Sequence, residues 1–192
     1  LVAIATLIIS YKGIVDLDQA YLNYDFSFPA ADPLEAAKAI GAAAAARYSL
    51  TGLLLGQQVG GIGTIFALGL MLGGLYLILR GFIRWEISLS YIVGVLVTAY
   101  LFSLSNPEKY AGPWFHLFAG YTLMGAFFLL TEYSSSPVNL IPMLVYGAGA
   151  GVMTILIRNI GGFTDGVVFA ILLFNIANPL LDKIRPKALG RS

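Results

Sequence analysis

Long apolar stretches alternate with short polar connections along most of this chain. The pattern predicts five segments of membrane-span length, at residues 64–79, 87–103, 112–130, 138–157 and 166–181. A helix that crosses a bilayer needs about 20 predominantly apolar residues. The pattern therefore predicts an all-α protein that crosses a membrane several times.

The first residues predict only part of a further span. Residues 1–9, "LVAIATLII", are apolar but too short to cross a bilayer, and they begin without a methionine or a basic segment. We expect them to be the end of a transmembrane helix and the chain to be the C-terminal part of a larger protein. Residues 10–35 then form a polar, acidic loop, and residues 183–192 a basic tail.

A glycine-rich interruption separates that loop from the five segments. Residues 49–63 read "SLTGLLLGQQVGGIG", a short apolar piece that breaks into glycines. Backbone that leaves a helix at membrane depth must be buried in protein or line a cavity. The stretch therefore predicts a broken or re-entrant segment within the membrane domain of residues 36–182. It would serve either as a close-packing joint or as half of a substrate or cofactor pathway.

The distribution of basic residues predicts the orientation. Because cytoplasmic loops carry an excess of lysine and arginine, the tail at 183–192 is placed in the cytoplasm. Counting back through five spans places Arg80 and Arg84 inside, and Lys109 and Arg158 outside. If residues 36–63 only dip into the membrane, the acidic loop is extracytoplasmic; if they cross it, the loop lies inside. The loop's poverty in basic residues favours the dip.

Composition excludes several classes of function. The chain is 58% hydrophobic and 11% charged, with a net charge of +1, no cysteine and one histidine. Soluble domains carry roughly 25% charged residues, so membrane lipid is an expected partner. The near-zero charge offers no footprint for nucleic acid. Without cysteine the chain alone forms no disulfide or iron–sulfur site, and no metal site is expected.

A few polar residues stand out against this background. Asp32 precedes Pro33 and fits the N-cap of a helix that continues through the alanines at 42–46. Arg158 and Asp165 flank "NIGGFT" and could pair across that turn. His116 begins a predicted span, where an interfacial anchor is favoured over a proton relay.

Three ordered blocks carry a resemblance to a known family. They are "GGLYLILRGFIRWEISLSYI" (73–92), "HLFAGYTLMGAFFLLTEYSSSPV" (116–138) and "LVYGAGAGVMTILIRNIGGFTDGVVFAILLFNIANPLLD" (144–182). Together they resemble the C-terminal half of the RnfD/NqrB family, the membrane subunits of Rnf and sodium-pumping NADH:quinone oxidoreductase complexes. The resemblance implies a urea-transporter-like fold of ten transmembrane helices in two inverted repeats. This chain would hold the second repeat, broken at 49–63.

The resemblance also implies a flavin site. Family members carry a "D…S-G-A-T-P-L" motif whose threonine is joined to FMN through a phosphoester on the outer side of the membrane. The run "DFSFPAADPL" matches it at Ser27, Ala31 and Pro33, but Asp32 stands in place of the threonine. A phosphoester needs a hydroxyl group, so FMN is the expected cofactor but a covalent link at Asp32 is not expected.

The function implied by the resemblance belongs to a complex. The chain would be a multi-pass subunit in the cell inner membrane, inactive alone, that passes electrons through flavin and couples them to Na⁺ or H⁺ translocation. Its partners would be the other Rnf- or Nqr-type subunits. Thr131, Glu132 and Asp165 are the candidates for an ion path, because polar and ionisable groups in membrane segments mark such paths. A channel or permease for a small solute is the alternative.

Overall fold

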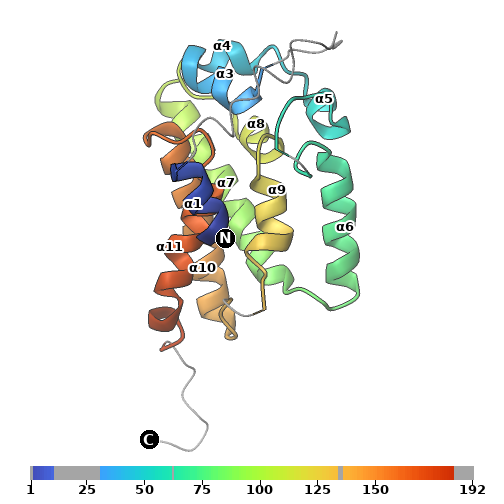
Figure 1. Ribbon diagram of the computed structural model, residues 1–192, viewed down its shortest axis with the longest axis vertical. Helices are drawn as coiled ribbons and strands as arrows, with labels where there is room; N and C mark the ends of the chain where they lie inside the picture. Colours follow the sequence, from blue (N-terminus) through green and yellow to red (C-terminus); the bar gives the residue numbers. More distant parts are fainter. Residues whose placement is uncertain (1, 11–30, 62, 134–135, 184–192) are drawn as a thin grey trace, which may run out of the picture.

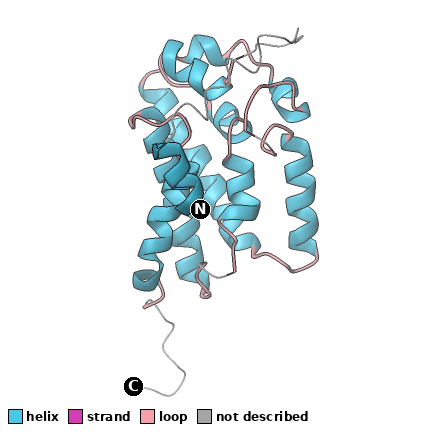
Figure 2. Cartoon of the chain, in the orientation of Figure 1, coloured by secondary structure: helices cyan, strands magenta, loops and turns pink. Residues whose placement is uncertain are grey.

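Helices joined by loops make up the part of the chain that the structure describes. The structure is a computed structural model that describes residues 2–10, 31–61, 63–133 and 136–183 (Figures 1 and 2). In these ranges the helices are α1 (Val2–Ser10), α3 (Pro33–Ile40), α4 (Ala42–Ala45), α5 (Leu50–Leu55), α6 (Ala67–Leu79), α7 (Trp85–Ser105), α8 (Pro113–Phe118), α9 (Thr122–Met124), the π-helical turn η2 (Gly125–Leu129), α10 (Leu140–Asn159) and α11 (Val167–Leu181).

Two helices are long and apolar enough to cross a membrane. They are α7, with 21 residues, and α10, with 20. At about 1.5 Å per residue each extends about 30 Å, the thickness of the hydrocarbon core of a bilayer. The apolar helices α6 and α11 are shorter, with 13 and 15 residues. The prediction of an all-α membrane protein is confirmed.

Glycines set the close packing of α7 against α10. A Cβ atom on Gly151 of α10 would lie 2.4 Å from the carbonyl oxygen of Tyr91. One on Gly94 of α7 would lie 2.5 Å from the carbonyl oxygen of Ala148. Small residues let helix backbones approach in this way in membrane proteins. The hydroxyl groups of Tyr91 and Thr154 are 3.1 Å apart across the same contact, so a hydrogen bond joins the helices inside the core.

The predicted helix after Asp32 is shorter than expected. The carboxylate of Asp32 accepts hydrogen bonds from the backbone N–H groups of Leu34, at 2.8 Å, and Glu35, at 3.4 Å, so the predicted N-cap is confirmed. The helix ends at Gly41, whose φ is 89°. The following alanines form only the four-residue α4, because the left-handed backbone at Gly41 breaks the helix.

The glycine-rich stretch turns back at one end of the bundle. Ser49 caps α5, accepting from the N–H of Gly52 at 3.0 Å, and α5 ends at Gly56, where φ is 85°. Its six residues extend only about 9 Å. Figure 1 shows α3, α4 and α5 together at the end of the bundle opposite the last turn of α11, and α6 running back along it. The side of the membrane on which this end lies stays a prediction.

The third predicted span is not one helix. Residues 112–130 divide into α8, a non-helical link at residues 119–121, and α9 followed by η2. Gly120 in the link has a φ of 67°, a conformation that side chains with a Cβ rarely adopt. Sequence hydropathy does not register one such glycine, so the apolar pattern predicted a continuous span.

Candidate functional site

The interruption between α8 and α9 creates a polar joint inside an apolar bundle. A helix that stops leaves carbonyl groups without partners, and one that starts leaves N–H groups without partners. Within a membrane protein such groups must be satisfied by protein or by water in a cavity. The side chains that satisfy them here come from α10, from the turn after α10, and from α9 itself.

Arg158, in the last turn of α10, binds the carbonyl groups at the end of α8. Its Nη1 donates to the carbonyl of His116 at 2.9 Å, and its Nη2 to that of Ala119 at 3.4 Å. The hydroxyl of Thr122 lies 2.8 Å from the first carbonyl and 3.1 Å from the second. A cation at the C-terminal end of a helix is also favoured by the helix dipole. The carbonyl groups of His116 and Ala119 therefore have hydrogen-bond donors, and a positive charge lies beside the end of α8.

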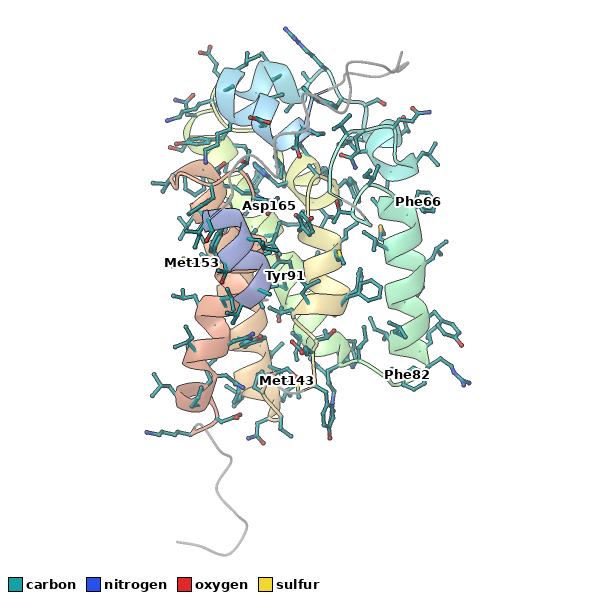
Figure 3. The ribbon with its side chains drawn as sticks, in the orientation of Figure 1. Phe66, Phe82, Tyr91, Met143, Met153 and Asp165 are labelled. Carbon is teal, nitrogen blue, oxygen red and sulfur yellow. The ribbon has the colours of Figure 1, made fainter. Side chains whose placement is uncertain are left out.

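Asp165 supplies the opposite charge to the beginning of the next helices. Its Oδ2 accepts from the N–H of Tyr121 at 2.7 Å, and its Oδ1 from the N–H of Val167 at 3.1 Å. Arg158 Nη2 lies 3.0 Å from Asp165 Oδ1, and the two side chains are 2% and 20% exposed. The predicted pairing across the turn is confirmed. We call this pair, with its backbone partners, the Arg158–Asp165 clamp; Figure 3 labels Asp165.

The second interruption, between α5 and α6, lies against the first. The buried amide of Gln58 donates to the carbonyl of Ile65 at 3.0 Å and to that of Phe118, the last residue of α8, at 3.4 Å. A Cβ on Gly61 would lie 2.3 Å from the phenol oxygen of Tyr121. One amide therefore satisfies carbonyls of both interruptions, and the two broken segments form a single polar joint.

The start of α3 contacts this joint. A Cβ on Gly120 would lie 2.4 Å from both Leu34 Cδ1 and Asp165 Oδ2. Burial of Asp32 raises the pKa of its carboxyl above the ordinary value, and the negative charge of Asp165 acts in the same direction. Two carboxylates thus face the interruption, one held by Arg158 and one held by the N–H groups of α3.

The residues expected at a flavin site lie partly at this position. Ser27 falls outside the described residues. Ala31, Asp32 and Pro33 form the start of α3, and the carbonyl of Ala31 accepts from the hydroxyl of Tyr48 at 3.0 Å. Asp32 has no hydroxyl group, and its carboxylate is engaged in capping α3. The residues present therefore do not fit a phosphoester-linked FMN at this position.

The candidates for an ion path are not brought together. Asp165 follows the C-terminal end of α10, whereas Thr131 and Glu132 precede its N-terminal end, so about 30 Å of helix separates them. The hydroxyl of Thr131 donates to the carbonyl of Phe127 at 2.6 Å, and Glu132 is exposed. Their part in ion movement stays a prediction.

His116 differs from its expected role. Its side chain is only 4% exposed, so it is not an interfacial anchor. Gln58, Gly120 and Thr122 were missed as parts of the joint. A glutamine within a glycine-rich apolar stretch was the available signal for the first. The other two carry no signal that distinguishes them from ordinary residues of a membrane helix.

The fold and the joint define a helical membrane protein with two interrupted segments packed together. The chain belongs to the NQR2, RnfD, RnfE family, whose model matches residues 1–190.

Named relatives agree with this assignment, and all three described here are RnfD subunits of ion-translocating oxidoreductase complexes. The chain is 40% identical over 139 residues to the RnfD subunit of Pectobacterium carotovorum, a match that covers 71% of the chain and 40% of the relative. For the RnfD subunit of Halorhodospira halophila the identity is 39% over 140 residues, covering 72% and 39%. For that of Escherichia coli it is 44% over 119 residues, covering 62% and 34%. The chain thus spans about 40% of the length of the first two relatives.

Proposed function

We propose that this chain is part of the membrane subunit of an ion-translocating oxidoreductase complex. The observation that carries the proposal is the family match over residues 1–190, together with relatives named as RnfD subunits of such complexes. In this reading the chain has no activity alone, and its partners are the other subunits of an Rnf- or Nqr-type complex. The complex would lie in the cell inner membrane, with this chain crossing it several times.

The fold suits a subunit that couples two processes. The joint gathers two interruptions, α5–α6 and α8–α9, at one level of the bundle, where Gln58 and Arg158 satisfy their carbonyls. Discontinuous helices line the ion and substrate sites of many membrane transporters. A urea-transporter-like fold of two inverted repeats, of which this chain would hold the second, would account for the broken segment at 49–63.

The redox cofactor of this proposal is FMN, held without a covalent bond to position 32. A carboxylate in place of a hydroxyl gives no durable link to phosphate, and its negative charge opposes a phosphate at the same helix end. The residues at the start of α3 therefore do not fit the linked form. Flavin supplies one- and two-electron chemistry that side chains do not.

The ion path of this proposal uses Glu132 at one end of α10 and Asp165 at the other. Asp165 is held by Arg158 at 3.0 Å, whereas Glu132 is exposed and free to exchange ions or protons with water. We therefore expect Glu132→Gln to lower the number of ions moved per electron without unfolding the protein. The matched control is Glu108→Gln, which changes an exposed carboxylate just after the C-terminal end of α7.

The test is redox-driven ion uptake. Inside-out vesicles from cells with and without the gene would be energised with a reduced electron donor, and uptake of Na⁺ and of H⁺ recorded separately. The proposal expects uptake of one ion that stops when electron flow stops and is absent without the gene. A purified, flavin-free protein that passes a neutral solute through liposomes with no donor would instead establish the channel or permease alternative.

A further inference from the structure

The helix α3 borders a hollow at one end of the bundle. The hollow has a volume of about 390 Å³, and Leu34, Ala37 and Lys38 line it from α3. His116 of α8 and Arg158 of α10 line it as well. Figure 1 shows α3 at this end of the bundle, together with α4. The hollow therefore lies between α3 and residues of the clamp.

Few contacts hold α3 against the bundle. Of its eight residues, only Pro33 and Leu34 are buried. Its main neighbour among the described helices is the four-residue α4. Segments with few buried apolar contacts open at a lower free energy than the core of a protein. We therefore expect α3 to open before α7 and α10, which form the most extensive contact between helices.

Lys38 ties the second half of α3 to the turn that follows α10. Its Nζ donates to the carbonyls of Gly161 and Phe163 at 2.6 Å each. Lys38 is exposed, so hydrogen bonds rather than packing hold its side chain in this position. Because the same turn joins Arg158 to Asp165, this contact links α3 to the clamp.

The two ends of α3 are fixed in different ways. At its start, the side chain of Leu34 packs against Gly120, because Cδ1 lies 2.4 Å from the position of a Cβ on that glycine. At its end, Gly41 has a φ of 89°, and the N–H of Ala42 donates to the carbonyl of Glu108 at 3.1 Å. The second contact holds α4 to the loop between α7 and α8. Gly41 is therefore a hinge about which α3 can turn while α4 stays in place.

We propose that α3 is a lid over this hollow and that Lys38 is its latch. In the closed state, the two hydrogen bonds of Lys38 and the contact of Leu34 hold α3 in place. When Lys38 releases the two carbonyls, α3 turns about Gly41 and water enters the hollow as far as Arg158. The lid is inferred from these contacts alone, whereas its use as the entrance of an ion path to Asp165 rests on the proposed function.

The test measures access to the hollow in the whole complex in detergent. Ala111 lines the hollow and is 5% exposed, so Ala111→Cys reports on access through its rate of labelling by a small, water-soluble methanethiosulfonate, followed by mass spectrometry of this subunit. The rate is compared with and without Lys38→Met, which keeps the apolar stem but removes the donors. The matched control is Arg47→Met, which removes an exposed cation just after α4. A second reporter, Ala99→Cys, lies in α7 at a position that is 0% exposed and detects opening of the whole bundle.

Lys38→Met is expected to speed labelling of residue 111 about tenfold, the effect of losing about one charge-assisted hydrogen bond. Arg47→Met should leave the rate unchanged, and residue 99 should stay unlabelled in every background. The proposal is overturned if Lys38→Met labels residue 111 no faster than Arg47→Met does. It is also overturned if residue 99 becomes reactive together with residue 111, because the bundle and not the lid then opens.

Hydrogen exchange of the backbone N–H groups of α3 decides the matter if Ala111→Cys does not fold. Exchange should be faster in Lys38→Met than in Arg47→Met, and equal rates would overturn the proposal. Neither measurement needs an electron donor. A failure of the lid is therefore distinguishable from a failure of the proposed function, which is read from redox-driven ion uptake.

Discussion

Replacing Arg158 with methionine tests whether the clamp holds the interrupted segment together. The guanidinium is 3% exposed, and it lies 3.0 Å from the carboxylate of Asp165. Methionine keeps the apolar stem and volume but removes the charge and three hydrogen bonds. It leaves Asp165 as an uncompensated, largely buried carboxylate, which costs about 3–5 kcal/mol of unfolding free energy. Thr122 still donates to the carbonyls of α8, so the loss is expected within that range.

The assay is a double-mutant cycle on the full-length protein in detergent. Unfolding is followed by far-UV circular dichroism during titration with denaturing detergent, for wild type, Arg158→Met, Asp165→Asn and the double variant. Asparagine removes the charge of Asp165, so the double variant no longer buries a lone carboxylate. We expect it to be more stable than the sum of the single losses predicts, with a coupling of about 1–3 kcal/mol. Arg84→Met, at the start of α7 and exposed, is the matched control.

Two results would refute this reasoning. If Arg158→Met loses less than about 1 kcal/mol, the cost expected for a broken buried ion pair is absent. If the two single losses simply add, Arg158 and Asp165 act independently, and the clamp is not a unit.

Three further changes test other parts of the structure. Gly151→Ala places a Cβ 2.4 Å from a backbone oxygen of α7 and is expected to cost about 1–3 kcal/mol in the same unfolding assay. In the control Gly162→Ala the added Cβ meets no atom within 4 Å, so stability should not change. Equal stabilities of Gly151→Ala and Gly162→Ala would contradict the close packing of α7 and α10. Gln58→Leu leaves buried carbonyls without a donor and is expected to cost about 1–3 kcal/mol, whereas the neighbouring exposed Gln57→Leu should not; a neutral Gln58→Leu would mean that water or a neighbour satisfies the joint. Asp32→Asn keeps an N-cap and removes a carboxyl whose pKa is raised in the folded state. Because the pKa of Asp32 is higher in the folded than in the unfolded protein, protonation of this carboxyl stabilises the fold. The stabilisation is complete below the unfolded pKa of 3.8 and is lost as the pH rises through the folded pKa. Asparagine should therefore melt at a higher temperature than aspartate near neutral pH, with the difference vanishing in acid; a difference that does not change with pH would contradict it.

The helical class and the N-terminal cap were accessible from sequence because both depend on local chemistry. An apolar stretch of span length predicts a membrane helix, and the Asp32-Pro33 pair predicts the start of a helix, from adjacent residues alone. The same holds for the turn at 160–164, whose short length brings Arg158 and Asp165 close enough to pair. Such features need no knowledge of the distant contacts of the chain.

The joint was not predictable because it depends on contacts between distant residues. Gly120 looks like any small residue of a membrane helix until Leu34 and Asp165 are seen against it. His116 reads as interfacial from its place beside Trp114, yet it is buried in a helix that packs against α7. Periodicity does not record which carbonyls a remote arginine will bind, so the interruption at 119–121 emerged only from the three-dimensional arrangement.

The placement of the two ends of the bundle across the membrane underlies the whole account, and it can be measured directly. Because the 192 residues contain no cysteine, single-cysteine variants in a cysteine-free background report on one site each. The two variants are Lys109→Cys and Phe82→Cys. Residue 109 lies between α7 and α8, and residue 82, where the phenylalanine is 67% exposed, lies between α6 and α7 at the other end of the bundle. A maleimide that does not cross membranes should label residue 109 in intact spheroplasts, and residue 82 only after the membrane is opened. Labelling of residue 82 in intact spheroplasts, with residue 109 protected, would put the start of α3 in the cytoplasm and contradict the account.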